Sequence, residues 1–189
     1  MEYKKLFLFL EGDDDERYFN YLLLELFKKK VSEIQIWKYA NKAIEKKKKF
    51  VNTINSVDFW DFIFFIDYDS STCITMKKEN IIKQLINVAK KNIIIIIEEI
   101  ESWYLAGVDN DFLREIGCQK LMDRRSIYLT KEIFNSMIPL KMPRINFMRK
   151  ILENYDIDKA IKNNSSLEYL FRKILNSKFF SGKLNFALK

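Results

Sequence analysis

The sequence contains no histidine, and its 189 residues include only four glycines, two prolines and two cysteines. Without histidine the chain cannot form a Ser-His-Asp or Cys-His catalytic site, an HNH-type nuclease site or most kinds of zinc enzyme site. The glycines are too few and too scattered for the GxGxxG fingerprint or the P-loop, which cradle phosphate groups. These absences remove several large classes of enzyme before any motif is considered.

Cys73 and Cys118 lie far apart and fit no metal-binding spacing, which indicates a reducing compartment without a disulfide framework. No apolar run reaches the roughly 18 residues of a membrane span. The first residues, MEYKKLFLFLEG, have too short an apolar stretch for a signal peptide, and acids stand where a cleavage site would lie. We therefore expect a cytoplasmic protein that has no membrane contact.

The charge balance is basic, with 33 lysines and arginines against 26 acids and a net charge of +7. Such a balance is typical of a protein with an anionic partner, such as nucleic acid. However, the heavy use of lysine, isoleucine, asparagine and phenylalanine is also what an AT-rich genome produces. The charge alone therefore leaves the nucleic-acid interpretation open.

Apolar spacing predicts alternating strands and helices in the first 108 residues. Strands are expected at 5–10, 33–39, 59–66 and 92–97, and helices at 13–30, 41–54, 76–91 and from about 98 onward. This alternation favours a parallel sheet with helices on both faces. Beyond residue 108 the patterns are helical. The prediction is an α/β, Rossmann-like core over 1–108, with a mostly parallel four-stranded sheet, and a helical C-terminal extension over 109–189 packed on that core.

Acidic residues follow three of the predicted strands. They are Glu11 after the first strand, Asp67 and Asp69 after the third, and Glu98, Glu99 and Glu101 after the fourth. The carboxyl ends of parallel strands meet at one edge of the sheet, where ligands bind in open α/β folds. Carboxylate oxygens are hard ligands that suit magnesium or manganese. The sequence therefore predicts a divalent-metal site at this edge.

Each acid also has an ordinary structural interpretation. Asp13 and Glu16 fit a capping box at the start of the first helix, so both are left out of the predicted site. Asp14 is expected to face solvent, and Asp15, four residues after Glu11, to turn back to the edge of the sheet. The Asp-x-Asp segment could be an acidic turn, and the glutamates after the fourth strand could interact with a helix dipole. Their shared placement at strand ends is what favours a site.

In their order and spacing, these motifs resemble the TOPRIM domain of type IA topoisomerases, bacterial primases and nucleases of the overcoming-lysogenization-defect type. The motifs are the Glu-Gly pair with an acid four residues on, the Asp-x-Asp in FFIDYDSS, and ESWYLAG. The last is similar to the Glu-x-Trp-x-Leu segment of small stand-alone TOPRIM-like proteins from phage-defence loci. PRINFMRKILENYDIDKAIKNNSSLEYLFRKI resembles their helical tail, so the likeness covers nearly the whole chain and implies a TOPRIM fold.

The resemblance also implies roles for matching positions. Its catalytic residues would be Glu11, Asp67 and Asp69, with Glu11 as a metal ligand or general acid and base. Its ligands for Mg²⁺ or Mn²⁺ would be Glu11, Asp15, Asp67, Asp69 and Glu101. For the phosphate-binding role, which no lysine or arginine matches firmly, the candidates are the residues that flank the Pro143 turn. These are Lys141 and Arg144, followed by Arg124 and Arg125.

The implied activity is metal-dependent cleavage of phosphodiester bonds in DNA or RNA, as a defence against phages or mobile elements. Two metal ions would stabilise the attacking and leaving oxygens. Expected partners are nucleic acid, an ATPase encoded nearby and a second copy of the chain. The C-terminal helices are expected either to shape the substrate channel or to form the dimer surface. A further hypothesis is a toxin-like effector whose nuclease activity needs activation by a partner. The rival hypotheses are a non-catalytic TOPRIM-fold module that binds nucleic acid or a partner ATPase, and a phosphate-accepting receiver domain.

Overall fold

The protein has one central sheet of four strands, seen in a computed structural model that describes residues 3–68, 73–118 and 129–176, with side chains as far as residue 173. The strands are β1 (Lys5–Leu10), β2 (Glu33–Lys38), β3 (Trp60–Asp67) and β4 (Ile93–Ile96). Their order across the sheet is β2-β1-β3-β4, and all three pairings are parallel. The predicted α/β class with a four-stranded parallel sheet is confirmed.

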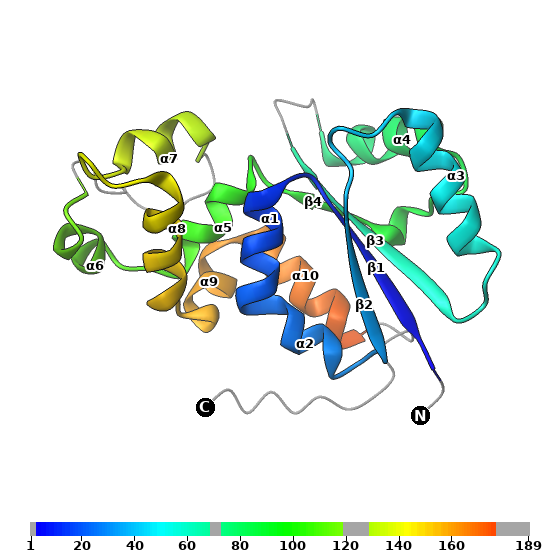
Figure 1. Ribbon diagram of the computed structural model, residues 1–189, viewed down its shortest axis with the longest axis horizontal. Helices are drawn as coiled ribbons and strands as arrows, with labels where there is room; N and C mark the ends of the chain where they lie inside the picture. The colour runs from blue at the N-terminus through cyan, green and yellow to red at the C-terminus, as the bar shows by residue number, and fades with distance from the viewer. Residues whose placement is uncertain (1–2, 69–72, 119–128, 177–189) are drawn as a thin grey trace.

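Helices cover both faces of this sheet (Figure 1). Between the strands and directly after the last one lie α1 (Asp13–Tyr18), η1 (Phe19–Leu23), α2 (Leu24–Lys28), α3 (Ile44–Asn55), α4 (Ile74–Leu85), the 3-10 turn η2 (Lys90–Asn92) and α5 (Ile100–Ala106). The helices α3 and α4 pack on one face, and α1, α2 and α5 pack on the other. The short segment η1 is a π-helical turn within the helix that the sequence predicted over 13–30.

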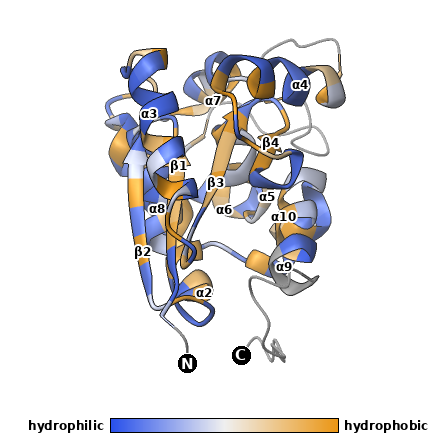
Figure 2. Cartoon of the chain, turned by 90° about the vertical axis from the view of Figure 1, so that its right-hand side faces the viewer, coloured by the Kyte–Doolittle hydropathy of each residue, from blue (hydrophilic) through white to orange (hydrophobic). Residues whose placement is uncertain are grey.

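The side chains of β1 show how the sequence builds two cores. Successive residues of a strand point to opposite faces, so the leucines and phenylalanines of KLFLFL separate. Leu6 and Leu8 join the cluster under α1 and α5, whereas Phe7 and Phe9 join the cluster under α3 and α4. The strand β4 consists of four buried isoleucines, as expected for a strand covered on both faces. In Figure 2 the central strand β3 is mostly apolar, whereas the edge strand β2 and the helices mix polar and apolar residues.

The remaining described helices are α6 (Asn110–Glu115), α7 (Lys131–Met137), α8 (Arg144–Glu153), α9 (Ile157–Asn163) and α10 (Ser165–Asn176). Buried side chains from α7, α8 and α10, such as Phe134, Phe147 and Leu167, belong to the same cluster as the leucines of β1. This part of the chain therefore shares a core with the sheet. Among the described helices, none has the length and apolar character needed to cross a membrane.

One predicted helix is shorter than its apolar spacing indicates. The helix expected over 76–91 spans Ile74–Leu85, and it is followed by Ile86 and Asn87 with φ of 52° and 60°. Asn87 accepts a hydrogen bond from Asn55 at its backbone oxygen, and its side chain donates to Asn52 of α3. These hydrogen bonds to α3 hold Asn87 in the left-handed turn that ends the helix. Ile86, which the spacing places inward, is consequently 55% exposed.

Candidate metal site at the carboxyl edge of the sheet

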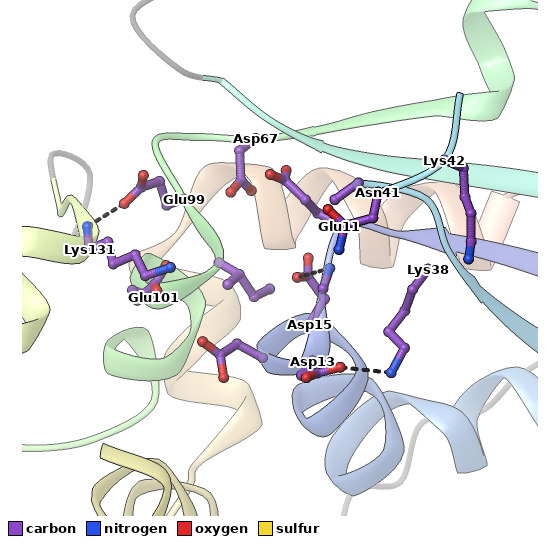
Figure 3. Close-up of a pocket in the computed structure, with 14 residues that line it drawn as sticks. Glu11, Asp13, Asp15, Lys38, Asn41, Lys42, Asp67, Glu99, Glu101 and Lys131 are labelled. Carbon is purple, nitrogen blue, oxygen red and sulfur yellow. Dashed lines mark hydrogen bonds and ion pairs between the residues drawn. The ribbon is translucent and has the colours of Figure 1, made fainter. Parts of the chain in front are cut away.

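A cavity of about 590 Å³ lies at the carboxyl edge of the sheet and is lined mainly by charged residues (Figure 3). Its charged lining consists of Glu11, Asp13, Asp14, Asp15, Asp67, Glu99 and Glu101, with Lys38, Lys42 and Lys131. Four of the five predicted metal ligands are therefore in one cavity. The fifth, Asp69, lies outside the described residues, as do Arg124 and Arg125.

The sheet topology explains why these acids meet. Glu11 directly follows β1, and Asp67 is the last residue of β3, paired in register with Ile96 at the end of β4. Glu101 lies in the first turn of α5, which starts four residues after β4 ends. Because all strands run in the same direction, their carboxyl ends deliver these side chains to one edge. Asp67 and Glu11 point toward each other across the cavity in Figure 3.

Asp15 is the most unusual carboxylate of the site. It is only 4% exposed, and its Oδ2 accepts a hydrogen bond from the Gly12 backbone N–H at 3.1 Å. Its buried Oδ1 has no hydrogen-bond partner among the described residues. Burial, together with the negative charges of Glu11 and Glu101, raises the pKa of Asp15 to about 7. A buried carboxyl oxygen without a partner beside other acids is the environment that a bound cation would stabilise.

Asp15 also replaces the predicted capping residues. The N-cap of α1 is Gly12, and the hydrogen bond from Gly12 to Asp15 closes the first turn. The predicted capping box of Asp13 and Glu16 is therefore wrong by one residue. Both of these acids instead accept hydrogen bonds at 2.7 Å from Lys38, at the end of β2. Since these ion pairs are largely solvent-exposed, they add little stability.

Arg144, at the start of α8, joins two acids of the cavity. Its Nη2 lies 2.5 Å from Oε1 of Glu101, its Nη1 pairs with Asp14, and its guanidinium lies 5.4 Å from the ring centroid of Phe134. Asp14 also pairs with Arg17 at 2.6 Å, so the expectation that Asp14 faces solvent is wrong. Burial opposes the charge of Asp14, but the two arginines outweigh it and hold the pKa of Asp14 below its usual range.

The two phosphate-binding candidates therefore lie in different settings. Arg144 contacts carboxylates of the cavity, whereas Lys141 is an exposed residue with φ of 69° in the turn before α8. Lys141 is not among the residues that line the cavity.

Glu101 is 3% exposed, and burial raises the pKa of its carboxyl against the opposing effect of Arg144. The contact with Arg144 gives Glu101 a structural role beside the predicted one of metal ligand.

We expect an Arg144→Gln variant to lower the free energy of unfolding by about 3 kcal/mol, because it leaves the buried Glu101 without its cation. Adding Glu101→Gln should recover part of this loss, since the uncompensated charge is then removed. Urea denaturation of the wild type, both single variants and the double variant measures the coupling. Arg149→Gln, on the same helix at an exposed position, is the matched control. Additive single effects would contradict the assigned contact.

Trp103, from the segment that carries the family resemblance, is a buried structural anchor. Its indole Nε1 donates to Oγ of Ser166 at 2.8 Å, and Ser166 Oγ donates to Oδ1 of Asn164 at 2.7 Å. Asn164 in turn donates to Ser102, whose hydroxyl donates to the Ile97 backbone oxygen at 3.0 Å. This chain of buried hydrogen bonds fixes the start of α5, and with it Glu101, against the start of α10.

The carboxylate oxygens of the cavity are the kind of ligand that a hard cation prefers, but the side chains that carry them are not close together. In the part of the chain that the structure describes, no three side chains of Asp, Glu, His or Cys are grouped closely enough to hold a metal ion. The partnerless oxygen of Asp15 and the like charges around it nevertheless fit a divalent ion. An ion would draw these carboxylates together and remove their repulsion.

Sequence reasoning overlooked several residues of the cavity. Lys38 and Lys42 were not considered, although Lys38 ends a parallel strand and so obeys the same rule as the acids. Lys131, whose backbone N–H donates to Glu99, comes from α7 and carries no local signal of its position. For Asn164 and Ser166, which anchor Trp103, the sequence predicted only that they lie in the helical C-terminal part of the chain.

Comparison with protein-family models finds no match to this sequence, and no curated protein or solved structure matches it either. The residues of the cavity are therefore the basis on which a function is proposed.

Proposed function

We propose that the protein is a metal-dependent phosphodiesterase that cleaves DNA or RNA, with a TOPRIM fold and a role in defence against phages or mobile elements. The observation that carries this proposal is the convergence of Glu11, Asp15 and Asp67 on one cavity, where a buried oxygen of Asp15 has no hydrogen-bond partner among the described residues. Clusters of carboxylates at strand ends are suited to divalent ions, which in turn bind phosphate groups.

The ion would be Mg²⁺ or Mn²⁺, held by Glu11, Asp15 and Asp67 and, following the resemblance, by Asp69 and Glu101. When bound, it would supply Lewis-acid stabilisation of the phosphate and a more acidic bound water. The remaining functions fall to the chain. Glu11 is exposed at the mouth of the cavity and could accept a proton from the attacking water.

Lysines that line the same cavity provide the attraction for a polyanion. Lys42 lines the cavity on the side of β2, and Lys38 lies below it in Figure 3. Their positive charges would bind backbone phosphates without reading sequence, and this binding should weaken as salt is added. Lys131 does the same from the side of α7. Lys38 is already paired with Asp13 and Glu16, and Lys141 lies outside the cavity, so Lys42 and Lys131 suit the phosphate-binding role best.

A non-catalytic module that binds nucleic acid or a partner ATPase is the second candidate. It is favoured by the contact between Arg144 and the two acids Glu101 and Asp14, which neutralises part of the negative charge. Such a module would retain affinity for nucleic acid and release no product.

The two candidates are separated by incubating the purified protein with supercoiled plasmid and with labelled tRNA in Mg²⁺ and in Mn²⁺. Cleavage that EDTA abolishes and added metal restores is the expected result. Binding of either nucleic acid in a mobility-shift assay, with no product at any metal concentration, would favour the module. Metal titration by calorimetry on the same samples tests whether the acids bind an ion at all.

A further inference from the structure

A second cavity, of about 350 Å³, lies between α3 and α4, on the face of the sheet that these two helices cover. Its floor is apolar and consists of Phe64, Ile66, Ile81 and Leu85. The volume falls in the range of about 300–1,000 Å³ that small-molecule sites occupy, and an apolar floor with a few polar groups is their usual character. The cavity therefore has the size and lining to accept a small organic group.

This second cavity adjoins the acidic one. Ile66 in its floor precedes Asp67 in the chain, and Tyr39 in its wall precedes Ala40 of the acidic cavity. Glu11 is close enough to Lys47, which lines the second cavity, to act electrostatically on it. A group bound in the second cavity would therefore lie beside the carboxyl edge of the sheet, next to the acids.

The polar lining combines positive charge with amides. Lys47 lies with its Nζ 4.9 Å from the ring centroid of Tyr39, and Lys77 donates to the Tyr68 backbone oxygen at 2.9 Å. Asn80 and Gln84 are exposed, stand one turn apart on α4, and have no hydrogen-bond partner among the described residues. An amide offers both donors and an acceptor, which is what the edge of a nucleobase requires.

We propose that this second cavity, between α3 and α4, binds an unpaired nucleobase of the substrate, next to the phosphate held at the acidic edge. The inference rests on the proposed function and makes it more specific. A base can enter the cavity only when it is unstacked and unpaired, so the protein selects single-stranded nucleic acid, or single-stranded regions, over a continuous duplex. The lysines contact the flanking phosphates, and the two amides contact the base edge.

The test compares a fluorescein-labelled single-stranded 12-mer with the duplex of the same sequence. Binding is measured by anisotropy in Ca²⁺, with the integrity of the oligonucleotides checked on a gel, and cleavage is measured in Mg²⁺ and Mn²⁺. We expect the single strand to bind at least about tenfold more tightly than the duplex. Replacing both amides, Asn80→Ala with Gln84→Ala, should weaken single-strand binding by about tenfold, because two hydrogen bonds are lost. Duplex binding should change less than about twofold.

Two further variants sharpen the test. Ile44→Trp, at a 40%-exposed position in the wall, should fill the cavity and act like the loss of the amides. Asn146→Ala, an exposed amide on α8, is the matched control and should have no effect. In cleavage assays the amide variants should raise KM with kcat unchanged, since they remove binding that is equal in the ground and transition states.

The outcomes separate this inference from the proposed function. Equal affinity for single strand and duplex, or unchanged affinity in the amide variants, would overturn the base-binding inference even if the protein cleaves nucleic acid. Amide-dependent preference for single strands without cleavage would support base binding and overturn the nuclease. Absence of both binding and cleavage would overturn both proposals.

Discussion

An Asp67→Asn variant is expected to lose cleavage activity by about 1,000-fold or more, with little change in stability. Asp67 ends β3 inside the acidic cavity, and its carboxylate supplies charge that an amide of the same shape cannot supply. Loss of one group that stabilises developing charge in a transition state typically lowers kcat by about 100- to 1,000-fold, and loss of a metal ligand weakens metal binding in addition. Initial rates on plasmid and tRNA measure the effect.

Asp13→Asn is the matched control for this experiment. Asp13 lines the same cavity, but its exposed carboxylate pairs with Lys38. We expect its removal to change the rate less than about threefold, because exposed ion pairs contribute little. Equal losses in the two variants would mean that the total negative charge of the cavity matters and that Asp67 has no special role. Glu11→Gln should resemble Asp67→Asn.

An Asp15→Asn variant is expected to be more stable than the wild type in EDTA at pH 8, and to lose the stabilisation that metal provides. In the folded wild type the pKa of Asp15 rises from 3.8 to about 7. At one pKa unit per 1.36 kcal/mol, ionisation at pH 8 opposes folding by up to about 4 kcal/mol. Asparagine keeps an acceptor for the Gly12 N–H and carries no charge.

The pH dependence has a definite sign. Between about pH 4 and pH 7 the unfolded chain has released the Asp15 proton while the folded chain still holds it, so wild-type stability falls as pH rises. This contribution should be absent in Asp15→Asn. Urea denaturation in EDTA across this range measures both slopes, with Asp13→Asn as the control that keeps the wild-type slope.

Added metal should offset the destabilisation that ionised Asp15 causes, and it should do so in the wild type and not in Asp15→Asn. Mg²⁺ or Mn²⁺ bound by Asp15 stabilises its ionised form, so the midpoint of thermal unfolding should rise with metal concentration, more at pH 8 than at pH 5. A wild type and an Asp15→Asn variant that gain equally from metal would place the ion elsewhere. A wild type that gains nothing would remove the metal site from the proposal.

Much of the core could be predicted from the sequence because its signals are local. The short apolar runs of β1 and β4 define strands that are buried on both faces, and parallel topology then brings Glu11 and Asp67 to one edge. The same rule would have found Lys38 at the end of β2. These predictions follow from strand periodicity and sheet direction, and neither depends on distant contacts.

The features that sequence reasoning missed depend on distant contacts. Arg144 meets Asp14 and Glu101 across 130 and 43 positions of the chain, so no local pattern could show whether it binds protein carboxylates or phosphate. The early end of α4 depends on asparagines of α3. The predicted capping box was wrong by one residue because Asp15 and Glu16 are neighbours, and either carboxylate could accept a backbone N–H at the start of the helix. Asp15 is the buried one of the two, and it accepts the N–H of Gly12.

The buried hydrogen bonds from Trp103 through Ser166 and Asn164 to Ser102 have a practical consequence for dissecting the protein. A fragment that stops at residue 108 would keep all four strands, yet it would leave the indole of Trp103 without its acceptor and uncover the apolar cluster that α8 and α10 complete. We expect such a fragment to aggregate. Deletion therefore cannot assign separate roles to the two parts of the chain, and point substitutions in the intact protein are the informative route.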